Sequence, residues 1–281
     1  MTVEENYRRW AEMPRSVSQV TEFEECPYKA WLKRVERIEP RPAAWSTHGT
    51  AFHSAAEAFE KSGRELTADQ AVTVFQDEYC QGINHDLGKL NDIDQWMRAN
   101  KGTAADDLEE RYEAGSRQTR EYVEYVQEHA PVLWYPKEHK RDGVWQVVNG
   151  APAVELYFMV EFGGVKVRGF IDQVLLNRDD SKRVRDLKTG STKSKFQLHV
   201  YGLAVNQLYP DEAPVTNGDW YLAKTGRVSR PVKMADADED EITERIVSMD
   251  QGVKAGDFPA KPGFGCRFCD VSHGCSFRSR S

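Results

Sequence analysis

A predicted β-hairpin in the second half of the chain constrains this sequence more than any other feature. Residues 165–176 are rich in β-branched and aromatic side chains, and residues 184–187 predict a short second strand after a turn-like segment. Asp172 lies on the first strand, and Asp186 and Lys188 lie on the second. Because side chains two residues apart on a strand point to the same face, two carboxylates and one ammonium group are predicted to converge.

This combination of side chains suits the hydrolysis of phosphate esters. Mg²⁺ and Mn²⁺ prefer oxygen ligands, and carboxylates commonly hold Mg²⁺ beside a substrate phosphate. A bound metal ion lowers the pKa of its water and neutralises charge on the phosphate. A neighbouring lysine can orient the attacking water and stabilise the transition state. The alternative is a solvated hairpin with ordinary surface charges, because Asp-x-Lys alone is a short and common pattern.

The longer pattern around this hairpin resembles the core of the RecB-type PD-(D/E)XK nucleases. The family's GxID, DxKTG and QxxxY motifs are matched in order by Gly169, Ile171, Asp172, Asp186, Lys188, Thr189, Gly190, Gln197 and Tyr201. The resemblance implies that Asp172, Asp186 and Lys188 are catalytic and that Gln197 and Tyr201 hold the substrate. Gln197 and Tyr201 lie four residues apart on a predicted helix, so they share a face. Packing in the core is the alternative for Tyr201.

A predicted helix over residues 47–61 carries the family's upstream histidine. The phrase Gly-Thr-Ala-Phe-His ends at His53 and matches the G-T-x-x-H motif. The resemblance implies that a Mg²⁺ or Mn²⁺ ion is bound by His53, Asp172, Asp186 and the Leu187 carbonyl. A histidine on a helix is otherwise a surface or core residue without a metal. Glu155, on the preceding strand, is either a further acid near the metal or an exposed strand residue.

The five cysteines are unevenly placed, and a chain of cytosolic character does not use them as disulfides. Cys266, Cys269 and Cys275 have metal-ligand spacing, with Cys26 followed by proline near the N-terminus. These four resemble the [4Fe-4S] ligands of AddB nuclease domains and CRISPR-associated adaptation exonucleases. Such a cluster would tie the two ends of the chain together. The alternative is a zinc site in which His273 replaces Cys26. Cys80 is predicted to be a buried free thiol.

Composition and charge bear on the cellular location of the protein and on its binding partners. The 281 residues carry a net charge of −7, and no apolar run approaches the length of a membrane span. The N-terminus lacks the apolar core of a signal peptide, so a cytoplasmic location is expected. Basic residues nevertheless gather near the candidate site, where they suit a phosphate backbone; they are Lys182, Arg183, Arg185, Lys188, Lys193 and Lys195. A solvated run of charge is the alternative.

The resemblance implies an α/β restriction-endonuclease-like core: a central mixed sheet flanked by helices, with a helical N-terminal insertion and an iron–sulphur staple. Four intertwined segments are expected: N-terminal helices (1–45), a helical region (46–150), the nuclease core (151–233), and a final helix with the cysteines (234–281). The residues before Ser16 are predicted to form a loose leader, and the alternative is that Tyr7, Trp10 and Met13 pack against the fold.

The resemblance implies a metal-dependent DNA exonuclease that acts on single-stranded ends in phage or prokaryotic recombination, repair or CRISPR adaptation. Its partners would be DNA and, in some settings, a helicase or a recombination or adaptation complex, without a membrane. No G-x-x-x-x-G-K-[ST] nucleotide-binding loop is present, so a motor within this chain is not expected. The alternative is a non-catalytic DNA-end-binding protein stapled by iron–sulphur or zinc.

Overall fold

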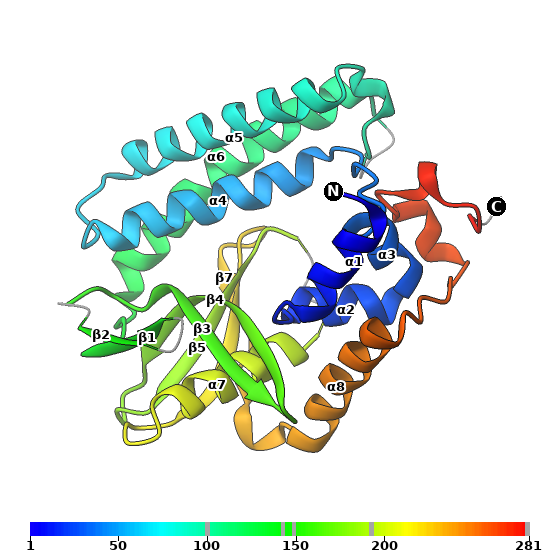
Figure 1. Ribbon diagram of the computed structural model, residues 1–281. Helices are drawn as coiled ribbons and strands as arrows, with labels where there is room; N and C mark the ends of the chain where they lie inside the picture. The colour runs from blue at the N-terminus through cyan, green and yellow to red at the C-terminus, as the bar shows by residue number, and fades with distance from the viewer. Residues whose placement is uncertain (99–101, 142–143, 148–149, 191–193, 279–281) are drawn as a thin grey trace. The chain divides into compact units, whose positions relative to one another are not determined.

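The computed structural model describes residues 1–98, 102–141, 144–147, 150–190 and 194–278 (Figure 1). The chain forms two compact units made of interleaved segments. The first unit comprises Met1–Pro42, Met159–Gly169 and Asp238–Ser281, and the second comprises Ala43–Phe158 and Phe170–Ala237. The division into four sequence segments stays a prediction. In the described part of the chain, no helix combines the length and apolar character of a membrane span.

Three long helices pack together in the second unit, as Figure 1 shows in blue to green. They are α4 (Ala44–Lys61), α5 (Ala68–Lys89) and α6 (Ala104–His129). Capping boxes at Thr67 and Thr103 fix the starts of α5 and α6, because each threonine and the side chain three residues later satisfy free backbone N–H groups. Apolar faces of all three helices form one buried cluster with Leu187 and Tyr221.

The sheet carries the candidate site. Its strands are β3 (Val154–Phe162), β4 (Val165–Leu176), β5 (Lys182–Lys188), β6 (Val215–Leu222) and β7 (Arg227–Val228), in that spatial order, with β8 (Val232–Lys233) beside β6. Strands β4 and β5 are antiparallel, as the hairpin prediction requires, whereas β5 and β6 are parallel. Helix α7 (Phe196–Leu208) makes the crossover that parallel strands need. A mixed sheet flanked by helices confirms the predicted α/β class.

Short elements complete the second unit. Strands β1 (Glu138–Arg141) and β2 (Val144–Val147) form a separate antiparallel pair. The 3-10 turns η1 (Ile93–Gln95) and η2 (Met234–Asp236) follow α5 and β8.

The first unit is mostly helical, with α1 (Val3–Glu12), α2 (Val17–Glu25), α3 (Pro27–Arg34), α8 (Glu239–Ala255) and the 3-10 turns η3 (Phe264–Phe268) and η4 (Ser272–Gly274). The predicted loose leader is wrong. Thr2 closes a capping box on α1, and Trp10 is 3% exposed, so one buried aromatic side chain and a cap order the segment.

Within this unit the N-terminal segment pairs with β4 and also contacts α8. The Arg15 backbone N–H donates to the Lys166 carbonyl at 2.8 Å, and the Arg168 N–H donates to the Arg15 carbonyl at 2.9 Å. The fully buried Arg15 guanidinium reaches Asp250 on α8, with Nε donating to Oδ1 at 2.8 Å.

Candidate metal centre

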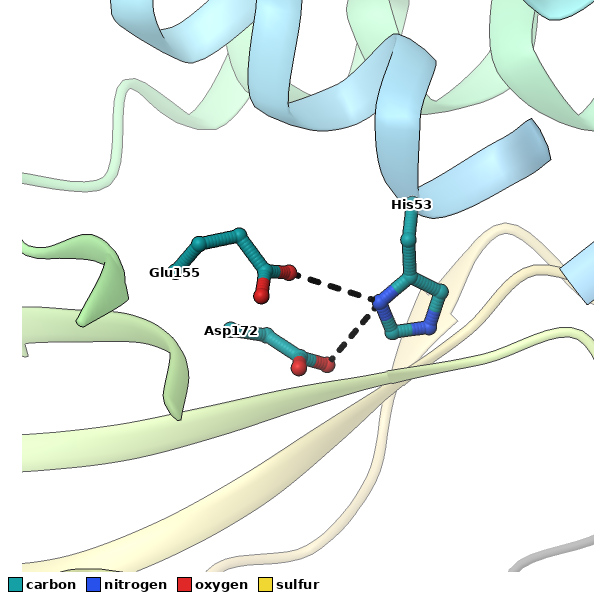
Figure 2. Close-up of side chains that lie close together, drawn as sticks. All are labelled: His53, Glu155 and Asp172. Carbon is teal, nitrogen blue, oxygen red and sulfur yellow. Dashed lines mark ion pairs between the residues drawn. The ribbon is translucent and has the colours of Figure 1, made fainter. Parts of the chain in front are cut away.

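A histidine and two carboxylates from three elements converge in the second unit (Figure 2). His53 projects from α4, Glu155 from β3 and Asp172 from β4. The His53 Nδ1 atom lies 3.6 Å from Asp172 Oδ2 and 3.7 Å from Glu155 Oε1. The other ring nitrogen, Nε2, lies 2.9 Å from the Leu187 carbonyl oxygen. That contact fixes the ring so that Nδ1 faces the two carboxylates.

Glu155 belongs to this group, although the sequence left its position open. The Val174 N–H donates to the Ala153 carbonyl, which sets the pairing of β4 with β3. The turn at Gly163–Gly164 lies midway between Glu155 and Asp172, so both side chains reach the same point. Equal distance from a predicted Gly-Gly turn is the signal that could have found this acid.

The backbone at Glu155 is unusual for a strand. Its φ of +50° lies in the left-handed region, which non-glycine residues seldom occupy. Such outliers cluster at functional sites, where the surrounding structure holds them in place. Here the distortion accompanies a carboxylate that faces the imidazole of His53.

Asp172 is held from the neighbouring strand. Its side chain is only 9% exposed, and its Oδ2 atom accepts a hydrogen bond from the Leu187 backbone N–H at 2.6 Å. Leu187 therefore contacts both ends of the group, through its N–H to Asp172 and its carbonyl to His53. The role of the Leu187 carbonyl as a metal ligand stays a prediction, and its oxygen lies at the edge of the group, against His53 Nε2.

A second chain of polar contacts runs from β5 to α7. The Lys188 Nζ atom lies 2.9 Å from Asp186 Oδ2 and donates to Asp186 Oδ1 at 3.1 Å. It also donates to Gln197 Oε1 at 3.1 Å, and the Gln197 amide donates to the Tyr201 hydroxyl at 2.8 Å. The structure thus joins four of the residues selected from the sequence. Asp186 is 1% exposed, and within the described parts of the chain no well-directed hydrogen bond reaches its Oδ2.

The electrostatics of the site reflect crowded acids. Burial, opposed by His53 and reinforced by Asp186 and Glu155, raises the pKa of Asp172 to about 7. Burial also raises the pKa of Asp186, against the opposing effect of Lys188. Burial lowers the pKa of His53, but Asp172, Glu155 and Asp186 outweigh it and raise the value to about 9. The site therefore favours added positive charge.

These residues fit a hard divalent cation. One ligand atom from each of His53, Glu155 and Asp172 lies within 4.8 Å of the other two, and among the described residues no other three His, Cys, Asp or Glu side chains meet that condition. Carboxylates and imidazole suit Mn²⁺ and, with mostly oxygen ligands, Mg²⁺. Asp186 stands outside this compact group, paired with Lys188.

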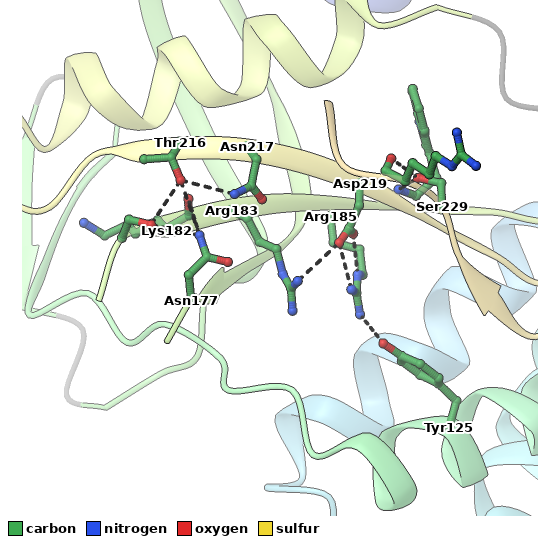
Figure 3. A network of polar contacts seen from close by, with 12 residues as sticks. Tyr125, Asn177, Lys182, Arg183, Arg185, Thr216, Asn217, Asp219 and Ser229 are labelled. Carbon is green, nitrogen blue, oxygen red and sulfur yellow. Dashed lines mark hydrogen bonds and ion pairs between the residues drawn. The ribbon is translucent and has the colours of Figure 1, made fainter. Parts of the chain in front are cut away.

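Much of the predicted basic cluster turns inward, as Figure 3 shows. Arg185 is 1% exposed, and its Nε and Nη2 atoms donate to Asp219 at 2.6 Å and 2.9 Å. Arg183 Nη1 lies 3.6 Å from the same carboxylate. Lys182 is 2% exposed and donates to the Ala213 carbonyl. Lys182 and Arg185 are thus buried in contacts within the fold, whereas Arg183 is partly exposed.

Two further lysines of the predicted basic cluster follow β5, before or at the start of α7. Lys195 is exposed at the start of α7, and Lys193 lies outside the described residues.

The four predicted cluster cysteines all lie in the first unit. Cys26 precedes α3, whereas Cys266, Cys269 and Cys275 lie in or beside η3 and η4. They are partly buried, and burial raises the pKa of Cys269, with a smaller contribution from Cys26. In the described chain, no three of their sulfur atoms lie within 4.8 Å of one another. The predicted burial of Cys80 is wrong, because that thiol is exposed on α5.

Known proteins resemble this chain over most of its length. The family model described as "PD-(D/E)XK nuclease superfamily" matches residues 14–276. The Gene 69 protein of Mycobacterium phage L5 is 34% identical over 278 residues, which cover 93% of this chain and 95% of that protein. The Gene 69 protein of Mycobacterium phage D29 is 35% identical over 269 residues, covering 93% and 96%.

Among solved structures, the crystal structure of SSO0001 can be superposed on this chain with a TM-score of 0.29 and 18% sequence identity. The match covers 44% of this chain and 59% of the SSO0001 chain. A likeness of that size supports no argument about fold or function.

Proposed function

The chain belongs to the PD-(D/E)XK nuclease superfamily, and on that premise we propose that it is a metal-dependent exonuclease acting on single-stranded DNA ends. Members of this superfamily are generally phosphodiester hydrolases. We place the activity in phage or prokaryotic recombination, repair or CRISPR adaptation; two similar proteins come from bacteriophages, which favours a phage setting. A helicase or an adaptation complex would be its partner where the DNA must first be opened.

One observation carries the proposal: a group of possible metal ligands and a lysine ammonium group belong to the same site. His53, Glu155 and Asp172 present ligand atoms to a common point. Lys188 lies between Asp186 and Gln197 and carries an ammonium group that can meet a phosphate or a water molecule. A cation site beside a positively charged donor is the arrangement that phosphodiester hydrolysis requires.

We assign Mg²⁺ or Mn²⁺ binding to Asp172, Asp186, His53 and the Leu187 carbonyl, with Glu155 as a further ligand. A bound divalent ion would supply Lewis acidity and a more acidic water. The raised pKa values of Asp172 and Asp186 support this assignment, because a cation relieves the repulsion between buried carboxylates. In the observed ring orientation Nδ1 faces the two carboxylates and Nε2 contacts the Leu187 carbonyl. The carbonyl would therefore join the same ion only after the ring releases it.

Lys188 would position the attacking water and stabilise the charge that develops on the phosphate. Its contacts with Asp186 and Gln197 hold the ammonium group in place. Gln197 and Tyr201 would bind the DNA backbone or orient Lys188 from α7. Burial raises the pKa of Tyr201, so its hydroxyl stays protonated and acts as a hydrogen-bond donor or acceptor rather than as a base.

Digestion of end-labelled oligonucleotides tests the activity. Single- and double-stranded DNA, labelled at either end, are incubated with the protein in Mg²⁺, Mn²⁺ or EDTA. Stepwise shortening of single strands that requires metal supports the proposal, and the labelled end gives the polarity. Binding of DNA ends without cleavage in either metal would instead favour the non-catalytic alternative.

Lys188→Met separates the chemistry from the fold. The substitution keeps the length of the side chain but removes its charge, so we expect cleavage to fall at least about 100-fold. The control is Lys61→Met in the same unit, because Lys61 forms an exposed pair with Glu57 four residues earlier on α4. Circular dichroism checks that both variants fold. Cleavage by Lys188→Met at the rate of the control would remove the assigned role.

We also propose that Cys26, Cys266, Cys269 and Cys275 bind a [4Fe-4S] cluster. The cysteine-bearing tail docks on the segment that follows Cys26: Lys33 Nζ donates to Asp270 at 2.9 Å, and the Arg41 N–H donates to the Asp270 carbonyl at 2.9 Å. Because the ligands of a multi-iron cluster bind different irons, their sulfur atoms need not crowd as closely as around one ion. Zinc bound with exposed His273 is the alternative.

Anaerobic purification distinguishes these two metals. Visible absorbance with about four iron and four sulfide per chain is expected for the cluster, and Cys26→Ser should lose it while His273→Ala keeps it. A colourless protein with one zinc, lost in His273→Ala, would establish the zinc site instead.

A further inference from the structure

An aromatic pair stands on the two strands that carry the carboxylates. Tyr157 on β3 and Phe170 on β4 are in contact, with ring centroids 5.4 Å apart and ring planes tilted by 59°. Phe170 is 50% exposed, although strands usually bury so large an apolar side chain. The exposed part of the Phe170 ring is therefore available to a flat partner.

The spacing of this pair ties it to the metal centre. Phe170 lies two residues before Asp172 on β4, and Tyr157 lies two residues after Glu155 on β3. Side chains two apart on a strand share a face and are separated by about 7 Å along it. Phe170 thus lies beside Asp172 on the same face, within the reach of one nucleotide. Both rings and both acids belong to the second unit.

We propose that Tyr157 and Phe170 form a stacking platform for the base next to the scissile phosphate, which makes the site selective for single-stranded DNA. The inference rests on the proposed nuclease function. In a duplex both faces of a base are covered by its neighbours, whereas an unpaired base can place one face on an aromatic ring. The carboxylate–imidazole group would hold the phosphate through its cation while the rings hold the adjoining base.

The charge of the neighbourhood favours this occupant over an apolar protein segment. Three acids lie beside the rings or one strand away, namely Glu155, Asp172 and Asp186. In the proposed nuclease these acids bind a cation, and the cation binds a phosphate of the substrate. A nucleic acid held by that phosphate also brings its bases to the rings. The platform would set affinity and strand preference, so its residues position the substrate and take no part in bond breaking.

Binding to a fluorescent single-stranded oligonucleotide tests the platform without cleavage. All measurements use an Asp186→Asn background, with anisotropy as the readout. Phe170→Ala and Phe170→Leu should each weaken binding at least about fivefold, and Phe170→Trp should restore it, because stacking needs an aromatic ring. The control is Tyr135→Ala, since Tyr135 is 49% exposed in the same unit but lines a cavity with Glu60 and Arg64.

An oligonucleotide with one abasic position identifies the contact. As the abasic position is moved along the strand, one position should weaken binding to the Phe170-containing protein and have no further effect on Phe170→Ala. The platform would be overturned if Phe170→Leu bound with full affinity, or if Phe170→Ala lost the same affinity for intact and for abasic DNA. Phe170 would then serve only to pack against Tyr157 within the hairpin. A changed oligomeric mass of Phe170→Ala with unchanged DNA affinity would overturn it in favour of a protein contact.

The two proposals fail separately in this design. Stacking is measured as the affinity for the oligonucleotide, without cleavage. If the unmutated protein does not cleave DNA, the nuclease proposal is refuted, but the measured affinities still test the stacking platform. Metal-dependent cleavage with unchanged binding and unchanged KM in Phe170→Ala would refute the platform alone. If the platform is correct, Phe170→Ala raises KM on single strands more than it lowers kcat.

Discussion

Glu155 combines a functional group with an unfavourable backbone. A left-handed conformation costs a residue with a Cβ atom about 1–2 kcal/mol, and this one lies within a strand beside the metal centre. The same residue brings its carboxylate to 3.7 Å from His53 Nδ1. The cost of the backbone and the use of the side chain can be separated by substitution.

Glu155→Gly and Glu155→Gln should affect the protein in different ways. Glycine accepts the positive φ, so Glu155→Gly should keep or raise the melting temperature while weakening metal-dependent cleavage about tenfold or more. Glu155→Gln should weaken cleavage without gaining stability. The control is Glu161→Gly on the same strand, which should lose about 0.5–1 kcal/mol. A clear loss of stability in Glu155→Gly would show that the backbone there is not strained.

The pKa values of Asp172 and His53 predict how stability without metal depends on pH. Both are raised above their unfolded values of about 3.9 and 6.5. The folded chain therefore holds these protons more tightly, and their contribution to stability is lost as the pH rises. For Asp172 the loss runs from about pH 4 to 7, and for His53 from about pH 6.5 to 9.

A divalent cation should reverse this loss, because it replaces the protons as the positive partner of the acids. The increase in melting temperature on adding Mn²⁺ to EDTA-treated protein should be larger at pH 8.5 than at pH 6. Asp172→Asn should reduce the difference. An equal increase at both pH values in the unmutated protein would contradict the assignment of the cation to this group.

At the scale of elements, local patterns predicted the hairpin and its neighbours well. The run of β-branched and aromatic residues in β4, the turn before β5 and the helix after it were all readable, because each depends on nearby residues. The motif also separated His53 from His48, which the structure buries against Gln118. Glu155 stayed ambiguous, since its role depends on register across a strand pair.

Side-chain direction at distant contacts could not be read in the same way. Lys182 and Arg185 looked like members of a surface patch, but their partners Ala213 and Asp219 come from a strand and loop some thirty residues later. Helix α1 was missed because its stability depends on the burial of Trp10 and not on a long apolar stripe. In both cases the structure depends on contacts between residues far apart in the sequence, which a local pattern does not reveal.

The packing of α5 against α6 allows a sharp test of this helical layer. A Cβ atom at Gly115 on α6 would lie 1.9 Å from the ring of buried Phe75 on α5. Gly115→Ala should therefore destabilise the protein by about 1–3 kcal/mol, despite the better helix propensity of alanine. Gly88→Ala on α5 meets no atom within 4 Å and should gain up to about 1 kcal/mol. Chemical denaturation measures both, and stabilisation by Gly115→Ala would contradict this packing.

At the scale of the whole molecule, contacts between remote segments hold the first unit together. Arg15 and Asp250 are 235 residues apart, and their side chains are 0% and 8% exposed. A buried pair of this kind need not add net stability, but removing one member leaves an uncompensated charge. The exposed Lys254 also lies 2.8 Å from the Asp250 carboxylate.

Asp250→Ala should therefore lower the free energy of unfolding by about 3–5 kcal/mol, because it leaves the Arg15 guanidinium buried without its carboxylate. Lys254→Ala removes only the exposed partner of the same carboxylate and should cost less than about 1 kcal/mol. Urea denaturation measures the difference between the two variants. Equal small losses would mean that water or another group reaches Arg15 once Asp250 is gone.

The interleaving of the two units also has a consequence for synthesis. Every segment of the second unit precedes Asp238, whereas the first unit includes Asp238–Ser281. On the ribosome, the acids and the lysine of the candidate site can thus adopt their places while the earliest helices still wait for α8 and the cysteine-bearing tail. A nascent chain stalled shortly before that tail would carry a folded second unit and an unfinished first unit.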